Sequence, residues 1–241
     1  MIDALTADGG TVELLVLVAV MVGAFAQGAT GMGFSLVAAP ALIAAQGQAS
    51  GVATVLVLAA CSSVVPLARE WRHAQPRPIA GLLAVTLLAT PVVAWALRGV
   101  DHRALALAGG VGVILGVVLL ASGLRSAWFR RPEGALATGV GSAVLNVVGG
   151  VGGPPVGLWV ANAEWSPPRT RATLHGFLIV QNLVTAVVVG LVAPDLRHLL
   201  ALAVGSAAGM ALAPRLSVGA ARSGILVVSA VGGIALLAGN V

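Results

Sequence analysis

The stretch VVGGVGGPPVGLW, residues 147–159, places four clustered glycines directly before two prolines inside a long apolar segment. Glycine weakens a helix interior, and proline removes a backbone donor and clashes with the preceding turn. A helix is therefore expected to break here, between apolar flanks. At membrane depth such a break is tolerated only where protein or a water-filled cavity satisfies the backbone.

The composition of the 241-residue chain predicts a membrane protein, because 59% of its residues are hydrophobic and only 9% are charged. Soluble domains carry about 25% charged residues. The apolar runs are continuous, which favours helices over the alternating pattern of barrel strands. All thirteen Lys and Arg positions are arginine, and the net charge is +5. These arginines lie between apolar segments, so they are interpreted as topology signals and not as a nucleic-acid surface.

The apolar segments divide into six full-length spans and two longer elements that are interrupted by glycine, about eight membrane helical segments in all. A single span needs about 20 apolar residues. The predicted spans are residues 51–68, 78–97, 104–123, 172–193, 196–213 and 223–241. The two interrupted elements, residues 11–46 and 135–163, are each too long for one span.

The two interrupted elements indicate an internal repeat within a single membrane domain, residues 1–241. An offset of 121 places Gly28 on Gly149 and Gly31 on Gly152. After each break come a short apolar piece, a small polar linker (46–50 or 167–171) and a full span. The predicted repeats cover about residues 11–124 and 133–241. The alternative is a chance likeness between two glycine-rich apolar segments.

The distribution of arginine favours re-entrant hairpins at both breaks. If each broken element crosses the membrane once, the arginines divide seven against six; if each returns to its own side, they divide ten against three. The second division satisfies the positive-inside rule. It places both termini outside the plasma (inner) membrane and makes the repeats inverted, which is typical of transporters. The ten arginines on the inner face are Arg69, Arg72, Arg77, Arg125, Arg130, Arg131, Arg169, Arg171, Arg215 and Arg222.

Two motifs resemble the TauE/SafE family of permeases. GVGGPPVGLWV followed by RTRATLHGFLIVQNLV is similar to the second conserved half of that family, and GAFAQGATGMGFSLVAAPAL, with Pro40, is similar to the first. The resemblance covers nearly the whole chain. It implies about eight membrane helical segments and secondary transport of small anions. These are often sulfite, sulfoacetate or other organosulfonates, and the usual direction is export.

The helix that restarts after each break is expected to point its free N–H groups into a shared cavity, where they attract an anion. Polar side chains near the breaks would add hydrogen bonds. The alternatives are that the glycines only allow close helix packing and that the polar groups only tie helices together. The candidate substrate-binding residues are Gly28, Thr30, Gly31, Gly33, Ser35, Asn146, Gly149, Gly150, Gly152, Gly153, Pro154, Arg171, Gln181 and Asn182.

Three ionisable residues lie near the second break. Arg171, within the family-like Arg-Ala-Thr, can bind an oxyanion with two parallel hydrogen bonds, although a topology charge is the alternative. His175 is a candidate for proton coupling, because histidine changes charge near neutral pH. Glu164 is a second candidate, against the alternative of an ordinary loop charge.

The sequence predicts a transporter and no enzyme. No acidic residue falls at a span centre, and the absence of lysine excludes a P-loop. No cofactor or metal site is predicted; the expected partners are a small anion and the lipid bilayer, with no nucleic acid. The main prediction is a secondary carrier working by alternating access; an anion channel is the alternative. An intramembrane enzyme built on Ser35 and His175 is a weaker one, because no G-x-S-x-G elbow is present. The sequence leaves a homo-oligomer open.

Overall fold

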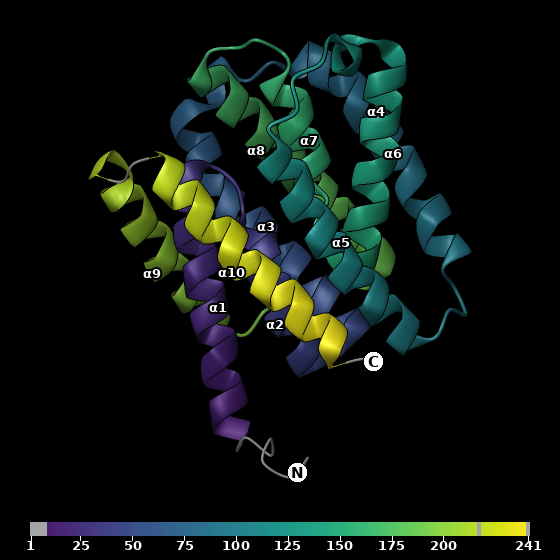
Figure 1. Ribbon diagram of the computed structural model, residues 1–241, viewed down its shortest axis with the longest axis vertical. Helices are drawn as coiled ribbons and strands as arrows, with labels where there is room; N and C mark the ends of the chain where they lie inside the picture. The colour runs from purple at the N-terminus through teal and green to yellow at the C-terminus, as the bar shows by residue number, and fades with distance from the viewer. Residues whose placement is uncertain (1–8, 216–217, 240–241) are drawn as a thin grey trace.

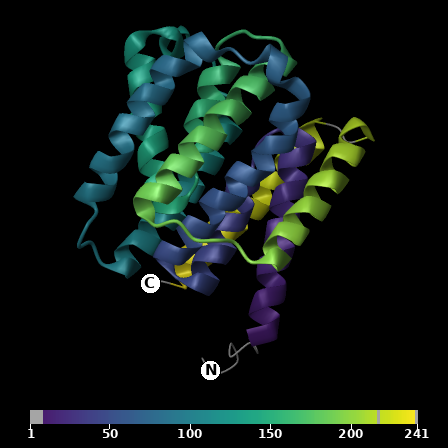
Figure 2. The same ribbon diagram turned by 180° about the vertical axis from the view of Figure 1, so that it is seen from behind.

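The computed structural model describes residues 9–215 and 218–239, and these residues form helices with no strand. Figures 1 and 2 show the bundle from two opposite sides. Three short 3-10 turns, η2 to η4, join some of the helices. The α-helices are α1 (Gly9–Thr30), α2 (Phe34–Gln46), α3 (Gln48–Glu70), α4 (Pro76–Ala96), α5 (His102–Ser122), α6 (Pro132–Gly149), α7 (Gly153–Ala161), α8 (Pro167–Val189), α9 (Leu196–Leu212) and α10 (Val218–Ala238).

Both predicted helix breaks are present. The chain leaves α1 after Thr30 and enters α2 at Phe34, and it leaves α6 after Gly149 and enters α7 at Gly153. At each break the second helix runs back toward the end from which the first one came (Figure 1). Gly31 and Gly150 have φ of +85° and +67°, which favour glycine strongly over residues with a Cβ. Each hairpin therefore turns on a glycine that is held in left-handed geometry.

The first break begins later than expected, because Gly28 and Thr30 lie inside α1. A Cβ on Gly28 would lie 2.8 Å from the carbonyl oxygen of Ser206 on α9. This glycine therefore serves helix packing, which was the alternative interpretation for the first glycine cluster. The structural breaks also match at an offset of 119 and not 121, as the pairs Gly31/Gly150 and Phe34/Gly153 show.

By length and composition, five helices of the described chain can cross a membrane: α1, α3, α4, α5 and α8. The sequence instead predicted six full spans without α1; α9 and the described apolar part of α10 are shorter. The predicted polar linkers are also shorter than expected. Only Gly47 separates α2 from α3, and residues 167–171 form the start of α8. Proline fits the first helical turn, because its missing N–H has no partner there in any helix.

The first five helices and the last five are interleaved. α1 packs along α9, α4 along α6, α3 against α8, and α5 against α10. Each of these pairs joins one helix from the first half of the chain to one from the second. The backbones of α1 and α9 approach each other closely. A Cβ on Gly205 would overlap the backbone carbonyl of Met21, and a Cβ on Gly209 would overlap that of Phe25. Neither half is therefore a separate packing unit.

We expect Gly205→Ala to destabilise the protein by about 2 kcal/mol, because the added methyl group forces α9 away from α1. Gly141→Ala is the matched control: it is also a helical glycine, but no atom lies within 4 Å of its Cβ position. The control should stabilise the protein by up to about 1 kcal/mol through helix propensity alone. Thermal unfolding in detergent micelles measures both variants. Equal stabilisation by both would contradict the packing role of Gly205.

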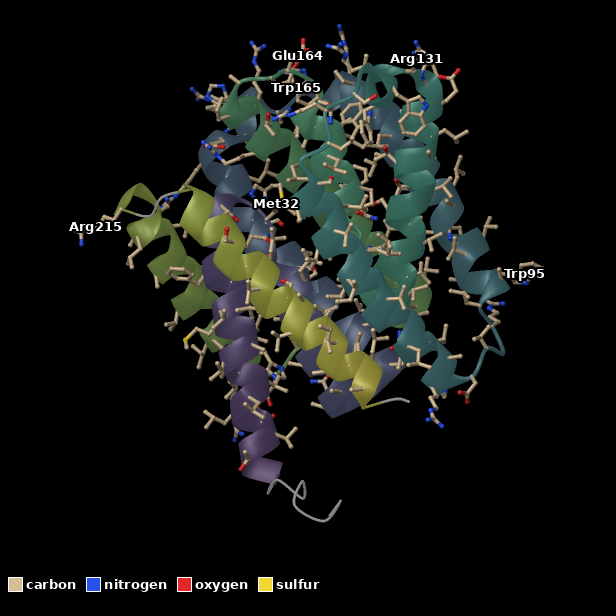
Figure 3. All side chains as sticks on the ribbon, in the orientation of Figure 1. Met32, Trp95, Arg131, Glu164, Trp165 and Arg215 are labelled. Carbon is tan, nitrogen blue, oxygen red and sulfur yellow. The ribbon has the colours of Figure 1, made fainter. Side chains whose placement is uncertain are left out.

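Several of the arginines lie at two opposite ends of the bundle. Arg69, Arg77 and Arg171 lie at the ends of α3, α4 and α8 that meet at the upper end in Figure 1, and Arg131 is labelled there in Figure 3. Arg103 and Arg197 begin α5 and α9 at the opposite end. α1 begins and α10 ends at this opposite end too. The side chain of Arg222 lies outside the described residues. Many large apolar side chains, including Leu88 at 73% exposure, face outward as expected of a surface in lipid.

Candidate functional site

The two breaks meet at one small cavity in the middle of the bundle. Its volume is about 30 Å³, enough for about two water molecules. The first break contributes Met32, Gly33, Ser35 and Leu36, and the second contributes Gly150, Val151, Gly153 and Pro154. The remaining lining residues are Gln27, Ala59, Leu120, Asn146, Leu174, Leu178 and Asn182. The two interruptions predicted from the sequence thus share a cavity, which we call the central cavity.

At each break a buried carboxamide side chain hydrogen-bonds to the neighbouring segments. Gln27 donates to the hydroxyls of Ser62 and Ser63 on α3, at 2.8 and 3.0 Å, and accepts from the Phe34 N–H at 3.3 Å. The second break repeats this arrangement. Asn146 donates to the Thr185 hydroxyl on α8 at 3.0 Å and accepts from the Gly152 N–H at 3.0 Å. Each amide therefore joins the end of one helix, the start of the next, and a neighbouring long helix.

The two breaks differ in the donors that they leave free for a ligand. At the start of α2, the N–H groups of Ser35 and Leu36 and the Ser35 hydroxyl bond to no other described residue. At the start of α7, two of the first three residues are prolines, which have no N–H. The amide of Asn182 is also without a partner in the described part of the chain, and it lines the same cavity. The Gly153 N–H also bonds to no other described residue, so the free donors lie at the start of α2, at the first residue of α7 and on α8.

Three of the candidate residues support the backbone of the second break and do not line the central cavity. Gln181 donates to the hydroxyl of Ser142 at 2.7 Å and to its carbonyl at 3.2 Å. A Cβ on Gly152 would lie 2.6 Å from the Gln181 amide nitrogen, and one on Gly149 would lie 3.3 Å from the backbone of Gly109. Gly149, Gly152 and Gln181 therefore hold the backbone of the break in place.

A larger cavity of about 580 Å³ lies between the first break and the upper ends of α3 and α8, and we call it the upper vestibule. Gln27 lines both this vestibule and the central cavity. Five of the candidate residues line the vestibule: Gly28, Thr30, Gly31, Arg171 and His175. The Thr30 hydroxyl lies 2.9 Å from the carbonyl oxygens of Ala26 and Met32, so it is already used to shape the turn.

Arg171 forms an ion pair with Glu70, a residue that sequence reasoning missed. Its Nε donates to both carboxylate oxygens, at 3.2 and 3.0 Å, and its Nη2 contacts Oε1. The side chains are 43% and 24% exposed. The pair joins the start of α8 to the end of α3 at the vestibule wall. Arg169, two residues earlier, is exposed and lines neither cavity.

His175 and Glu164, the two candidates for proton coupling, lie in different surroundings. His175 is completely buried in α8 and lines the upper vestibule. Glu164 lies at the upper surface in Figure 3, where its 74% exposed side chain pairs with Arg130 at 2.7 Å. It lines neither the central cavity nor the upper vestibule. His175 makes no hydrogen bond with Ser35 or any other described residue, so no nucleophile–base pair is formed.

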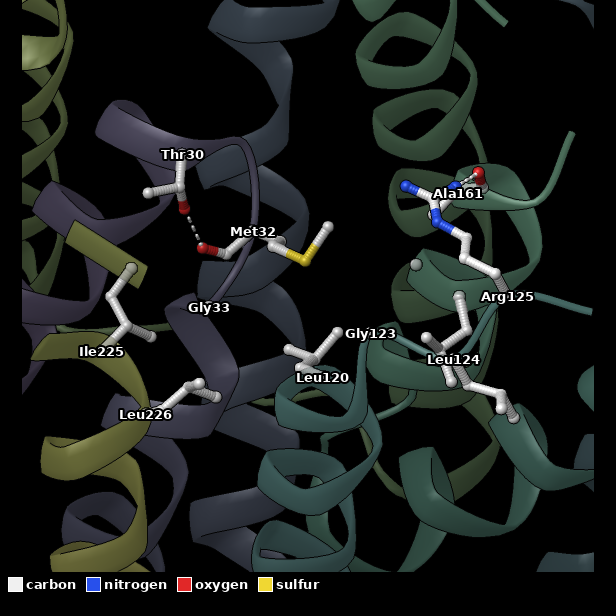
Figure 4. Close-up of a pocket in the computed structure, with 12 residues that line it drawn as sticks. Thr30, Met32, Gly33, Leu120, Gly123, Leu124, Arg125, Ala161, Ile225 and Leu226 are labelled. Carbon is white, nitrogen blue, oxygen red and sulfur yellow. Dashed lines mark hydrogen bonds between the residues drawn. The ribbon is translucent and has the colours of Figure 1, made fainter. Parts of the chain in front are cut away.

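Two further cavities flank the breaks. One, of about 290 Å³, lies at the opposite end between the start of α3 and the ends of α4 and α8, and we call it the lower vestibule. At its edge Gln48 donates to the carbonyl of Val148. The other, of about 230 Å³, is mainly apolar (Figure 4). The side chain of Met32 points into it opposite Leu120, and Thr30 closes the turn behind.

Paired broken helices around a shared cavity with several polar side chains, within a bundle whose outer surface is apolar, define a multi-pass membrane transporter. The model of the sulfite exporter TauE/SafE family matches residues 15–239. The chain belongs to this family, whose members are transporters and not enzymes. Comparison with curated proteins and with solved structures finds no match. No group of three His, Cys, Asp or Glu side chains that could hold a metal ion occurs among the described residues.

Proposed function

We propose that this protein is a secondary carrier that exports a small sulfur oxyanion or organosulfonate across the plasma membrane. The observation that carries the proposal is the set of free donors at the central cavity. The Ser35 and Leu36 N–H groups, the Ser35 hydroxyl and the Asn182 amide face it from two sides of the breaks. Such groups bind an oxyanion without a buried cation, helped by the positive end of the α2 dipole.

The arrangement of cavities supports alternating access. The central cavity, at about 30 Å³, is too small for a sulfonate and has to widen before an anion enters. Vestibules of about 580 and 290 Å³ lie toward the two opposite ends. An open channel would need a continuous pore, so this sequence of wide, narrow and wide spaces favours a carrier. Closing one vestibule while opening the other would expose the same donors to each side in turn.

We infer that the two halves are inverted repeats, α1–α5 and α6–α10. In each half the second helix is the shortest, with 13 and 9 residues, and the third is the longest, with 23 residues in both. Corresponding helices run in opposite directions in Figure 1. If each helix is exchanged for its counterpart in the other half, the α1–α9 contact becomes the α6–α4 contact. The same exchange leaves the α3–α8 and α5–α10 pairs unchanged. The two carboxamides, Gln27 and Asn146, occupy equivalent positions 119 residues apart. A rocking motion about the α3–α8 pair would exchange the two vestibules.

The arginine-rich upper end is assigned to the cytoplasm by the positive-inside rule. Both termini then lie outside. The larger vestibule faces the cytoplasm, where an exporter loads its cargo. Arg69 on its wall, together with the other arginines at this end, would attract anions toward its mouth. Nothing in the described part of the chain supports a homo-oligomer, so the proposal concerns a single chain.

Reconstitution in proteoliposomes tests the function. The protein should move radiolabelled sulfite or organosulfonates with saturation and counterflow, and should distinguish them from sulfate and carboxylates. Empty liposomes and the Gly150→Ala variant described below are the controls. Unitary currents in planar bilayers without counterflow would support the channel instead. Absence of transport for every anion of the panel would contradict both.

Ser35→Ala is expected to raise KM for the transported anion about tenfold, because one hydrogen bond to a charged group contributes about 1.5 kcal/mol. Asn182→Ala should have an effect of similar size for the same reason. Ser122→Ala is the matched control, since Ser122 lies exposed at the end of α5 and bonds only its own helix end. Initial rates of uptake over a range of anion concentrations give KM. An unchanged KM in both variants would show that these donors do not bind the transported anion.

A further inference from the structure

We propose that the upper vestibule contains a coupled site, in which an anion binds between Arg171 and His175 while His175 takes up one proton from solvent. The inference rests on the proposed carrier function and names its coupling ion. The site is built from the α1–α2 turn, the end of α3 and the start of α8. It lies outside the central cavity, on the route from the cytoplasmic end.

The burial of His175 is the first observation. The side chain is 0% exposed, and neither ring nitrogen has a hydrogen-bond partner among the described residues. Buried polar groups are otherwise almost always paired. His175 lines a cavity of about 580 Å³, so its partner can enter through that cavity. Its Nε2 lies 3.8 Å from the Cβ position of Gly31, so this turn of the first break borders the ring directly.

The Arg171–Glu70 pair is the second observation. Arg171 lies one helical turn before His175, and its side-chain carbons lie 3.4 Å from the Cβ position of Gly31. Glu70 covers the Nε–Nη2 edge of the guanidinium, the edge that two oxygens of a sulfonate would otherwise occupy. The Glu70 carboxylate therefore acts as a built-in competitor that a cargo anion must displace or bind beside.

The balance of charge then requires the proton. Arg171 and Glu70 cancel each other, and an unpartnered imidazolium at zero exposure would be too costly, so the empty site is neutral at this depth. An anion that enters brings one negative charge and supplies the missing acceptor for an imidazolium N–H. The proton comes from vestibule solvent, binds a ring nitrogen and returns to solvent when the anion leaves. One monoanion and one proton thus move together without net charge.

The other charged groups near His175 lie in solvent. Arg69 on α3 lines the vestibule but is exposed, so its charge is screened. Elements that pack against α8 contribute further exposed groups, namely Arg72 and His73 of η2 and Arg77 of α4. α1 and α9 place no titratable side chain on the wall of this cavity. Glu70 and Arg171 are therefore the charges that face His175 most directly.

Calorimetric titration of the full-length protein in detergent tests the inference. Methanesulfonate is the probe, because it stays a monoanion at every pH used. Titrations in two buffers of different ionisation enthalpy give the number of protons taken up per anion bound. We expect about one proton for the wild type at pH 7, and an affinity that falls up to tenfold per pH unit above neutrality. Saturable binding without proton uptake would overturn the inference and leave the carrier in place.

Variants locate the proton. His175→Gln should still bind methanesulfonate, about tenfold more weakly at pH 6, with no proton uptake and a flat pH profile. His198→Gln is the matched control, because His198 is also buried and unpartnered but lines none of the cavities described here. Glu70→Gln should bind the anion about three- to tenfold more tightly and still take up one proton. Proton uptake that persists in His175→Gln would overturn the assignment.

The wild-type stoichiometry needs no variant, so the inference stays testable even if His175→Gln does not fold. Failure to bind methanesulfonate, sulfite or any other anion of the panel would instead contradict the proposed function itself. Proteoliposomes give an independent readout. With the membrane potential clamped at zero, an acid-inside pH gradient alone should drive efflux of methanesulfonate from wild-type vesicles.

Discussion

Gly150→Ala is expected to reduce transport to less than a tenth of the wild-type rate and to destabilise the protein by about 3 kcal/mol. Gly150 has φ of +67°, a conformation that costs an L residue about 1–2 kcal/mol. A Cβ at this position would also overlap a methyl group of Val55 on α3. Because Gly150 lines the central cavity, any relief of this overlap moves the break itself. Proteoliposome transport and thermal unfolding in detergent measure the two effects.

The double variant Gly150→Ala/Val55→Ala separates the overlap from the backbone strain. Shortening Val55 removes the overlapping methyl group, but the left-handed backbone remains. The double variant should therefore be more stable than the sum of the two single changes by about 1–2 kcal/mol. Strict additivity would mean that the side chain of Val55 does not limit this position. Wild-type transport by Gly150→Ala would exclude a functional role for the turn.

Asn146→Asp is expected to abolish anion transport while the fold is retained. The carboxylate can still accept the Gly152 N–H, as the Asn146 amide oxygen does at 3.0 Å, but it can no longer donate to the Thr185 hydroxyl, so some stability is lost. It also places a negative charge on the wall of the central cavity. Two like charges about 4 Å apart repel by about 4 kcal/mol at an effective dielectric constant of 20, which corresponds to roughly a thousandfold loss of affinity. Uptake assays and a size-exclusion profile together show whether the loss is electrostatic.

Asn162→Asp is the matched control for this charge. Asn162 is another buried asparagine that accepts a backbone N–H, from Ser126 at 2.9 Å, and it sits at the end of α7 outside the central cavity. This variant should lose some stability, because Asn162 also donates to the carbonyls of Leu124 and Leu158. Its KM should stay within about twofold of the wild type. An equal loss of transport in both variants would point to unfolding and not to repulsion of the anion.

The positions of the breaks were predictable to within a few residues, because glycine and proline act locally. The Gly-Gly-Pro-Pro run contains Gly153, the residue at which α7 begins. The first break was placed too early because Gly28 looks like a turn glycine in the sequence. It is a packing glycine against α9, a helix about 180 residues later, and no local pattern reveals that contact.

Long-range polar pairs were the part of the candidate site that the sequence concealed. Glu70 and Arg171 are 101 residues apart, and each looks like an ordinary charge at a span edge. The hydrogen bonds that support the second break do have a signature in the sequence. Ser142 and Asn146 are four residues apart, as are Gln181 and Thr185, so each pair shares one helix face. Two such polar faces in apolar spans predict a buried network.

The two prolines at the start of α7 also bear on the shape of the cargo. Pro154 faces the central cavity beside Val151, Leu174 and Leu178, all of them without a side-chain donor, whereas Ser35 and Asn182 supply the donors. The lining therefore offers a bound molecule hydrogen-bond donors and hydrocarbon side by side. An ion of uniform polarity, such as sulfate, would lose hydration against the hydrocarbon without replacement. A head-and-tail molecule, with a sulfonate head and a short carbon tail, matches both.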